Sequence, residues 1–293
     1  LSLRRQRQMC IRDSPYIIAS EACERFSFYG MRNILTPFLM TALLLAVPEH
    51  LRAGEAKDVF HSFVIGVYFF PLLGGWLADR YLGKYNTILW LSIVYVIGHL
   101  FLALFETSKE GFYTGLFLIA LGSGGIKPLV SAFMGDQFDQ SNKALAQKAF
   151  DIFYFTINFG SFFASLLMPL TLKHFGAAVA FGIPGVLMAL ATLFFWLGRK
   201  RYVHIAPEPK DPHSFLKVVK TALLSKESGK ANGGLYLALV GFALALFSLS
   251  QTPTLGFVAA FCLALVLVMG FGGAGAAIQL ERARGVHLSL IHI

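Results

Sequence analysis

Residues 16–47 read YIIASEACERFSFYGMRNILTPFLMTALLLAV, an apolar segment that nevertheless contains four charged side chains. The charges are Glu21, Glu24, Arg25 and Arg32. On insertion scales, each charge at the centre of a bilayer costs on the order of 2.5–3.5 kcal/mol. At about 100° per residue, these charges share one stripe of a helix with Phe28 and Tyr29. The stripe must therefore face other helices or a water-filled cavity, and only the opposite side can face lipid.

The composition of the whole chain is that of a membrane protein. Of its 293 residues, 56% are apolar and 14% are charged, against roughly 45–50% and about 25% in soluble proteins. A soluble domain of this composition would expose large apolar patches, which lipid accepts without cost. We therefore predict an all-α integral membrane fold.

Eight apolar segments are long enough, at about 20 residues each, to cross roughly 30 Å of hydrocarbon. They are residues 16–47, 59–77, 87–105, 112–133, 150–172, 177–197, 234–250 and 255–280. The first six form a block with short connections, the first of which is predicted at residues 48–57. We expect a six-helix bundle at residues 15–198 and two additional transmembrane helices at residues 234–280.

The remaining segments are polar. Residues 199–233 are predicted to be a cytoplasmic linker with an amphipathic interfacial piece at residues 215–224. Residues 1–14 lack the apolar middle of a signal peptide, and we expect them to be a non-native leader. Residues 281–293 would be a cytoplasmic end, of which the last residues, LSLIHI, are also expected to be non-native.

The distribution of Lys and Arg predicts the orientation. With a cytoplasmic N-terminus, and with residues 1–14 left aside, fourteen basic residues fall on the cytoplasmic side and four fall outside. This asymmetry follows the positive-inside rule. The net charge of +9 therefore reflects topology, and no nucleic-acid partner is expected.

A further charge inside a predicted span is Lys127, in the segment GSGGIKPLVSAF. Three glycines precede it, Gly122, Gly124 and Gly125, and Pro128 follows. Glycines let helices approach closely, and proline removes a backbone amide. We hypothesise that Arg32 and Lys127 together bind an anionic substrate group. In the alternative, Lys127 is neutralised by a carboxylate elsewhere and the charges at residues 21–25 are a structural clamp.

Polar side chains also recur at helical spacing. Tyr154, Asn158, Ser161 and Ser165 form a stripe, and His61 and Tyr68 share one face of their span. Such groups either line a binding site or cross-link helices, and both readings stay open. For His61, close to the outer end of its span, a gate and a plain interfacial histidine are equally plausible.

Signatures of catalysis and of metal binding are missing from the sequence. No complete nucleotide-binding loop, nucleophile elbow or H-E-x-x-H motif occurs. The three cysteines lie far apart and form no zinc or disulfide pattern. We predict no enzyme activity, no metal site and no cofactor.

Four motifs resemble those of the proton-dependent oligopeptide transporters (the POT or PTR family), a branch of the major facilitator superfamily. EACERFSFYG (residues 21–30) is similar to the signature E-x-x-E-R-F-x-Y-Y-G, with Phe28 in place of its first Tyr. GGWLADRYLGKYNTI (74–88), GSGGIKPLVSAFMGDQF (122–138) and FYFTINFGSF (153–162) resemble three further motifs. They occur in the family's order along the first six predicted spans.

The resemblance implies a proton-coupled symporter of di- and tripeptides, driven by the proton gradient, in a bacterial inner membrane. It implies a proton-coupling cluster of Glu21, Glu24 and Arg25. The residues that it places in the peptide site are Tyr29, Arg32, Tyr68, Lys127, Tyr154 and Asn158. The resemblance also implies that Asp79 and Arg80 belong to a loop motif that latches the two halves of the protein. His61 is not part of the resemblance and stays a candidate gating residue by its position alone.

The resemblance also implies two six-helix bundles that rock around a site at the membrane midplane. This chain would be the N-terminal half, with the C-terminal bundle as its missing partner, and the last two spans look like the extra helices of bacterial members. Two alternatives remain open. One is a symporter of another anionic solute, such as nitrate or an organic acid, and the other is a non-transporting membrane fragment.

Overall fold

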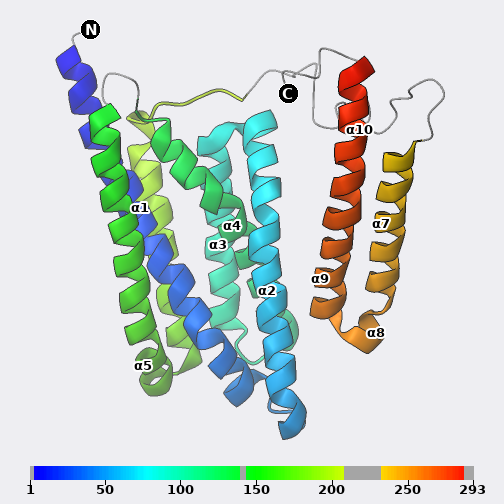
Figure 1. Cartoon of the computed structure of the whole chain (residues 1–293). Helices are drawn as coiled ribbons and strands as arrows, with labels where there is room; N and C mark the ends of the chain where they lie inside the picture. Colours follow the sequence, from blue (N-terminus) through cyan, green and yellow to red (C-terminus); the bar gives the residue numbers. More distant parts are fainter. Residues whose placement is uncertain (1–2, 139–142, 208–231, 287–293) are drawn as a thin grey trace. The chain divides into compact units, whose positions relative to one another are not determined.

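The computed structural model describes residues 3–138, 143–207 and 232–286, and all regular elements in these residues are helical (Figure 1). The all-α prediction is therefore confirmed. The chain divides into two compact units, Leu1–Glu208 and Pro209–Ile293. The predicted amphipathic piece at residues 215–224 and the end at residues 288–293 lie outside the described residues.

The first unit is a bundle of long helices. Its elements are α1 (Leu3–Phe38), the π-helix η1 (Leu39–Leu43), α2 (Glu49–Leu77), the π-helix η2 (Ala78–Leu82), α3 (Gly83–Leu104), α4 (Lys109–Gly135), α5 (Lys143–Leu197) and the 3-10 turn η3 (Gly198–Lys200). Helix α1 packs along α5, and α4 packs against both α2 and α3. Helix α1 thus begins within the segment that we expect to be a leader.

Two apolar helical runs of this unit are too long for a single crossing. Glu49–Leu104 and Leu145–Lys200 contain 56 residues each. At 1.5 Å per residue such a run would extend about 84 Å, whereas the hydrocarbon layer is roughly 30 Å thick. Each run is interrupted at a glycine with positive φ, Gly83 at 75° and Gly176 at 80°, a conformation that glycine adopts at no steric cost. Each run therefore supplies two spans, as the sequence predicts.

Helix α1 is not among the helices that hydropathy alone identifies as spans. Its charged side chains and Asn33 lower its mean hydropathy, although its middle is buried among the other helices. The fold thus gives the charged helix a protein environment in place of lipid.

One predicted boundary is wrong. The loop expected at residues 48–57 is helical, because α2 already begins at Glu49. Pro48 immediately precedes the helix and the Glu49 carboxylate lies in its first turn, where negative charge is favourable. The polar residues therefore extend the helix beyond its apolar part.

The second unit is a helical hairpin. It contains α7 (Gly233–Ser250), α8 (Thr252–Leu255), α9 (Phe257–Leu267), the π-helix η4 (Val268–Gly272) and α10 (Gly273–Val286). Gly256, with φ 78°, ends α8 and begins the return (Figure 1). Both arms, Gly233–Ser250 and Phe257–Gln279, are long and apolar enough to span a membrane.

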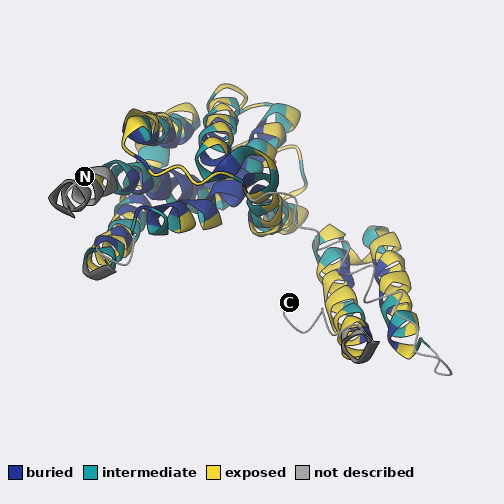
Figure 2. Cartoon of the chain, turned by 90° about the horizontal axis from the view of Figure 1, so that it is seen from above, coloured by how far each residue is buried: buried dark blue, intermediate teal, exposed yellow. Residues whose placement is uncertain are grey.

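Helix α4 is the best enclosed of the candidate spans, because 61% of its most apolar stretch is buried. Seen from above, buried residues gather between the helices of the first unit (Figure 2). The glycines of α4 allow this packing. A Cβ at Gly122 would lie 2.7 Å from the Leu91 carbonyl oxygen, and a Cβ at Gly74 on α2 would overlap the Gly125 backbone. The expected close approach of helices is therefore observed.

This contact leads to a test with neighbouring glycines. We expect Gly74→Ala to lower the free energy of unfolding by about 1–3 kcal/mol, because two helix backbones must move apart to admit one methyl group. Gly75→Ala is the matched control, since a Cβ there meets no atom within 4 Å. Thermal unfolding of the purified chain in detergent measures both, and equal stabilities would contradict the proposed contact.

Candidate functional site

Three buried charges lie together on α1. The relative exposures of Glu21, Glu24 and Arg25 are 3%, 3% and 8%. The Arg25 Nε lies 2.5 Å from Glu21 Oε1 and 2.8 Å from Glu24 Oε2. The Arg25 guanidinium therefore forms ion pairs with both carboxylates. All three side chains face the interior of the bundle, as the helical periodicity of the charged stripe predicts.

The two carboxylates differ in their hydrogen bonding. Glu21 accepts a hydrogen bond from Arg25 Nε. Both carboxylate oxygens of Glu24 are buried without a hydrogen-bond partner among the described residues, although Arg25 is close enough for an ion pair. A buried carboxylate with incomplete hydrogen bonding is costly in its charged form. Of the two, Glu24 is thus the carboxylate whose surroundings least compensate a negative charge.

Lys127 reaches the same region from α4. Its Nζ lies 3.3 Å from the centroid of the Phe28 ring, a close cation–π contact. It interacts electrostatically with Glu24, but the described residues give it no ion-pair partner. Phe28 stands at the position where the family signature has its first Tyr. Its phenyl ring therefore forms the surface that the Lys127 ammonium contacts.

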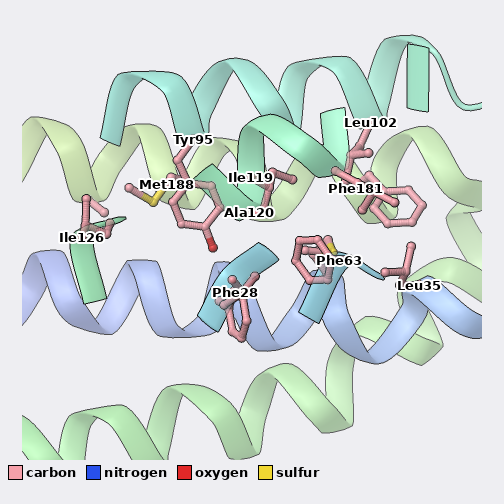
Figure 3. Close-up of a cluster of buried hydrophobic side chains, with 14 of the residues drawn as sticks. Phe28, Leu35, Phe63, Tyr95, Leu102, Ile119, Ala120, Ile126, Phe181 and Met188 are labelled. Atoms are coloured by element: carbon pink, nitrogen blue, oxygen red, sulfur yellow. The ribbon is translucent and has the colours of Figure 1, made fainter. Parts of the chain in front are cut away.

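Arg32 and Tyr29 continue the stripe of α1 and are partly exposed. The Arg32 guanidinium lies 5.6 Å from the centroid of Phe60 on α2. Tyr29 packs edge-on against Phe28, with ring centroids 5.5 Å apart, and Phe28 itself stacks on Phe63 (Figure 3). Arg32, like Lys127, forms no ion pair within the described part of the chain.

The other predicted peptide-site residues lie on the surface of the first unit. Tyr68 on α2 and Tyr154 on α5 are 73% and 57% exposed, and Asn158 and His61 are exposed as well. The Asn158 amide donates to the Tyr154 carbonyl oxygen at 2.8 Å. These side chains are therefore accessible, and the unit alone does not enclose them with Lys127 in one pocket.

The predicted loop motif lies where α2 ends. Asp79 is exposed and Arg80 is partly exposed, both in the π-helix η2. The strong ion pair in this region is a different one, in which Lys84 donates to both carboxylate oxygens of Asp136, at 2.9 and 2.7 Å. It ties the start of α3 to the end of α4. Sequence reasoning missed it, because the partners are far apart in the chain.

A cavity of about 420 Å³ lies elsewhere, between α1 and α5. Asn33 and Pro37 from α1 and Thr41 from η1 line it, with Lys173 from α5. None of the predicted site residues lines it. The described residues contain no group of His, Cys, Asp and Glu that could hold a metal ion.

Sequence reasoning also missed a buried polar junction next to the charged cluster. Ser27 on α1 and His99 on α3 are both 0% exposed, and their side chains lie 2.9 Å apart. Ser27 also donates to the Pro184 carbonyl oxygen of α5 at 2.7 Å. A single His and a single Ser in separate apolar spans form no sequence pattern.

Comparison with known proteins identifies the type of protein. The sequence model of the POT family matches residues 85–236. Solute carrier family 15 member 2 of Rattus norvegicus is 39% identical over 225 residues, 72% of this chain and 30% of that protein. Peptide transporter 3 of Caenorhabditis elegans is 38% identical over 232 residues, 74% of this chain and 32% of that protein.

A solved structure agrees with these relatives. The crystal structure of the POT family transporter PepTSo superimposes with a TM-score of 0.89 and 77% sequence identity, over 94% of this chain and 55% of that one. These proteins are transporters and not enzymes, and the apolar helices make the chain a multi-pass membrane protein. The chain spans about a third of the curated relatives' length and about half of the solved structure's.

The shared guanidinium leads to a stability test. We expect Arg25→Met to lower the free energy of unfolding by about 3–5 kcal/mol, because it removes the ion-pair partner of two buried carboxylates. Lys57→Met, at an exposed lysine of α2, is the control and should change little.

Adding Glu21→Gln and Glu24→Gln to Arg25→Met should recover much of the loss, since the uncompensated charges are then gone. Denaturant unfolding in detergent gives the free energies. A triple variant as unstable as Arg25→Met would show that packing, not charge, is the cause.

Proposed function

The chain belongs to the POT family, and we propose that its first unit is one bundle of a proton-coupled symporter of di- and tripeptides that works by alternating access. One observation carries this proposal. A buried cluster of two carboxylates and one arginine lies beside an ammonium that has no ion-pair partner in the described part of the chain. The first group suits proton exchange, and the second suits an anionic substrate.

The charges give a physical basis for coupling. Glu21, Glu24, Arg25, Arg32 and Lys127 sum to +1 when both carboxylates are ionised. Protonation of one carboxylate raises the sum to +2 and strengthens the attraction for a peptide carboxylate. Glu24 is the proposed proton acceptor, because none of the described residues donates a hydrogen bond to its carboxylate. Proton binding and peptide binding then favour each other, as linkage requires.

In this proposal, Lys127 and Arg32 bind the carboxylate of the peptide. Tyr29, Tyr68, Tyr154 and Asn158 offer hydroxyl and amide groups to its backbone. The exposure of Tyr68 and Tyr154 suits a site that is completed by a second six-helix bundle of the whole protein. His61 is assigned to a gate, and Asp79 and Arg80 to the loop motif that latches the halves.

The proposed organisation keeps the predicted boundaries. Residues 15–198 form the bundle, residues 199–233 a cytoplasmic linker, and residues 234–280 two helices between the bundles. Residues 1–14 and the last residues of the segment 281–293 are non-native in this proposal. The N-terminus is cytoplasmic and the location is a bacterial cell membrane, with the proton gradient as driving force and no cofactor.

The carboxylate contact can be tested with the whole transporter in liposomes. We expect Lys127→Ala to weaken the binding of a dipeptide about 10- to 100-fold, which is the value of a charge-assisted hydrogen bond. The affinity for the same dipeptide with an amidated C-terminus should change little on Lys127→Ala, because the amide offers no carboxylate to the ammonium. Lys148→Ala, at an exposed lysine of α5, is the control.

The competition of both ligands against labelled dipeptide uptake gives the affinities. If Lys127→Ala lowered the affinity for the free acid and for the amide equally, Lys127 would not contact the peptide carboxylate. Uptake of nitrate or an organic acid, with none of dipeptide, would favour a symporter of another anion. No uptake of any of them by folded protein would favour a non-transporting membrane protein.

The coupling residue has its own test. We expect Glu24→Gln to remove the dependence of uptake on the proton gradient while peptide counterflow, which needs no net proton movement, continues. Glu55→Gln is the control, because Glu55 pairs with Lys109 at 3.4 Å but is partly exposed on α2. Gradient-driven uptake that keeps its pH profile in Glu24→Gln would assign proton coupling to another group.

A further inference from the structure

His99 is a buried polar residue that the proposed mechanism does not use. It lies on α3, fully enclosed, and stacks on Tyr95 one turn earlier, with ring centroids 5.0 Å apart. Its neighbour on α5 is Gly185, where a Cβ would lie 3.1 Å from the His99 Cβ. Three helices, α1, α3 and α5, thus meet around one imidazole.

The hydrogen bonds fix the direction of donation at this junction. The Ser27 hydroxyl has one hydrogen and donates it to the Pro184 carbonyl oxygen at 2.7 Å. The contact of 2.9 Å between Ser27 Oγ and His99 Nε2 is then made by the imidazole as donor. His99 Nδ1 has no partner among the described residues, so the ring is held to α1 through Nε2.

The junction adjoins the charged cluster. Ser27 follows Glu24 by three residues, so both lie on neighbouring positions of one helix face. The next residue, Phe28, holds the Lys127 ammonium at 3.3 Å from its ring centroid. Tyr95, supported by the His99 ring, points from α3 toward α1 (Figure 3). Rotation of α1 about its axis would therefore move Glu24 and Phe28 relative to Lys127.

We propose that His99 is a positioning residue for proton coupling. Its Nε2–H bond to Ser27 fixes the rotation of α1, and thereby the placement of Glu24 and Phe28 opposite Lys127. The inference rests on the proposed function, because it assigns a role in coupling to a residue that touches neither proton acceptor nor peptide. A hydrogen-bond donor is what this role requires.

The charged and titratable groups near Glu24 come from three helices. Glu21 and Arg25 lie on α1, Lys127 on α4, and the Tyr95 hydroxyl reaches toward them from α3. The hydrogen-bond and ring contacts that His99 makes among the described residues are with Ser27 on α1 and with Tyr95, and not with Glu24. A loss of the His99 donor should therefore change coupling through geometry, by letting α1 turn.

The first experiment measures the rotation of α1 without any substrate. Cys23 lies on α1 four residues before Ser27 and is partly exposed, so its alkylation by a maleimide reports the rotation of that helix. Cys10→Ser and Cys262→Ser remove the other thiols. We expect His99→Leu and Ser27→Ala to change the alkylation rate of Cys23 about tenfold, as the loss of a buried hydrogen bond permits. His99→Gln retains an N–H donor and should keep the original rate.

The second experiment uses the whole transporter in liposomes. His99→Leu should reduce uptake driven by the proton gradient about tenfold and shift its pH profile, while peptide counterflow stays within about twofold. His99→Gln should keep the original rate of gradient-driven uptake and the original pH profile. Thr87→Val is the matched control, because Thr87 is also fully buried on α3 but its hydroxyl donates to the Gly83 carbonyl oxygen of its own helix.

The outcomes separate the two proposals. An unchanged Cys23 alkylation rate in His99→Leu overturns the positioning role, and so does a parallel loss of uptake and counterflow in both His99→Leu and His99→Gln. If the unaltered transporter shows no peptide counterflow, the proposed function fails instead. The alkylation rates then still decide whether His99 sets the rotation of α1.

Discussion

The ion contacts of Arg25 with Glu21 and Glu24 are the constraint on which the bundle depends. Charges on a membrane helix must be kept out of lipid, so α1 must be surrounded by other helices along its charged stripe. The fold meets this requirement by packing α1 along α5 and by bringing α4 and α3 to its inner face. The middle of a helix of low hydropathy is thereby buried within an apolar bundle.

Close helix packing makes this arrangement feasible. Helices in lipid gain little from the hydrophobic effect when they associate, so backbone proximity and buried hydrogen bonds must hold them together. Gly74 and Gly125 allow α2 and α4 to touch, and Ser27 and His99 join α1 to α3. The ion pair of Lys84 with Asp136 joins the start of α3 to the end of α4.

Hydropathy predicts the spans of α2 to α5 and of the hairpin, because every crossing needs about 20 apolar residues, but it does not identify the charged helix α1. It was insufficient for helix ends, since Glu49 and the polar residues after it continue α2 outside the apolar window. The charged stripe of α1 was predictable from helical periodicity, as Glu24 and Arg25 face inward. The partners of Ser27 and Lys84 were not, because their contacts join positions 72 and 52 residues apart. Periodicity also gave no facing direction for Tyr154, whose stripe is exposed on this unit.

The position of Lys127 on the Phe28 ring bears on how fast the proposed transporter would release its substrate. An aromatic face attracts an ammonium through its quadrupole and leaves the three N–H donors free. The Phe28 ring therefore holds the side chain in position without occupying the donors that an incoming anion needs. In the proposed function, loading and unloading would exchange one solvent or ligand contact of Lys127 for another, and the described residues hold no ion pair with Lys127 that must break first. Such a support then favours rapid turnover over tight retention in the proposed function, as a site that is exposed to two compartments in turn requires.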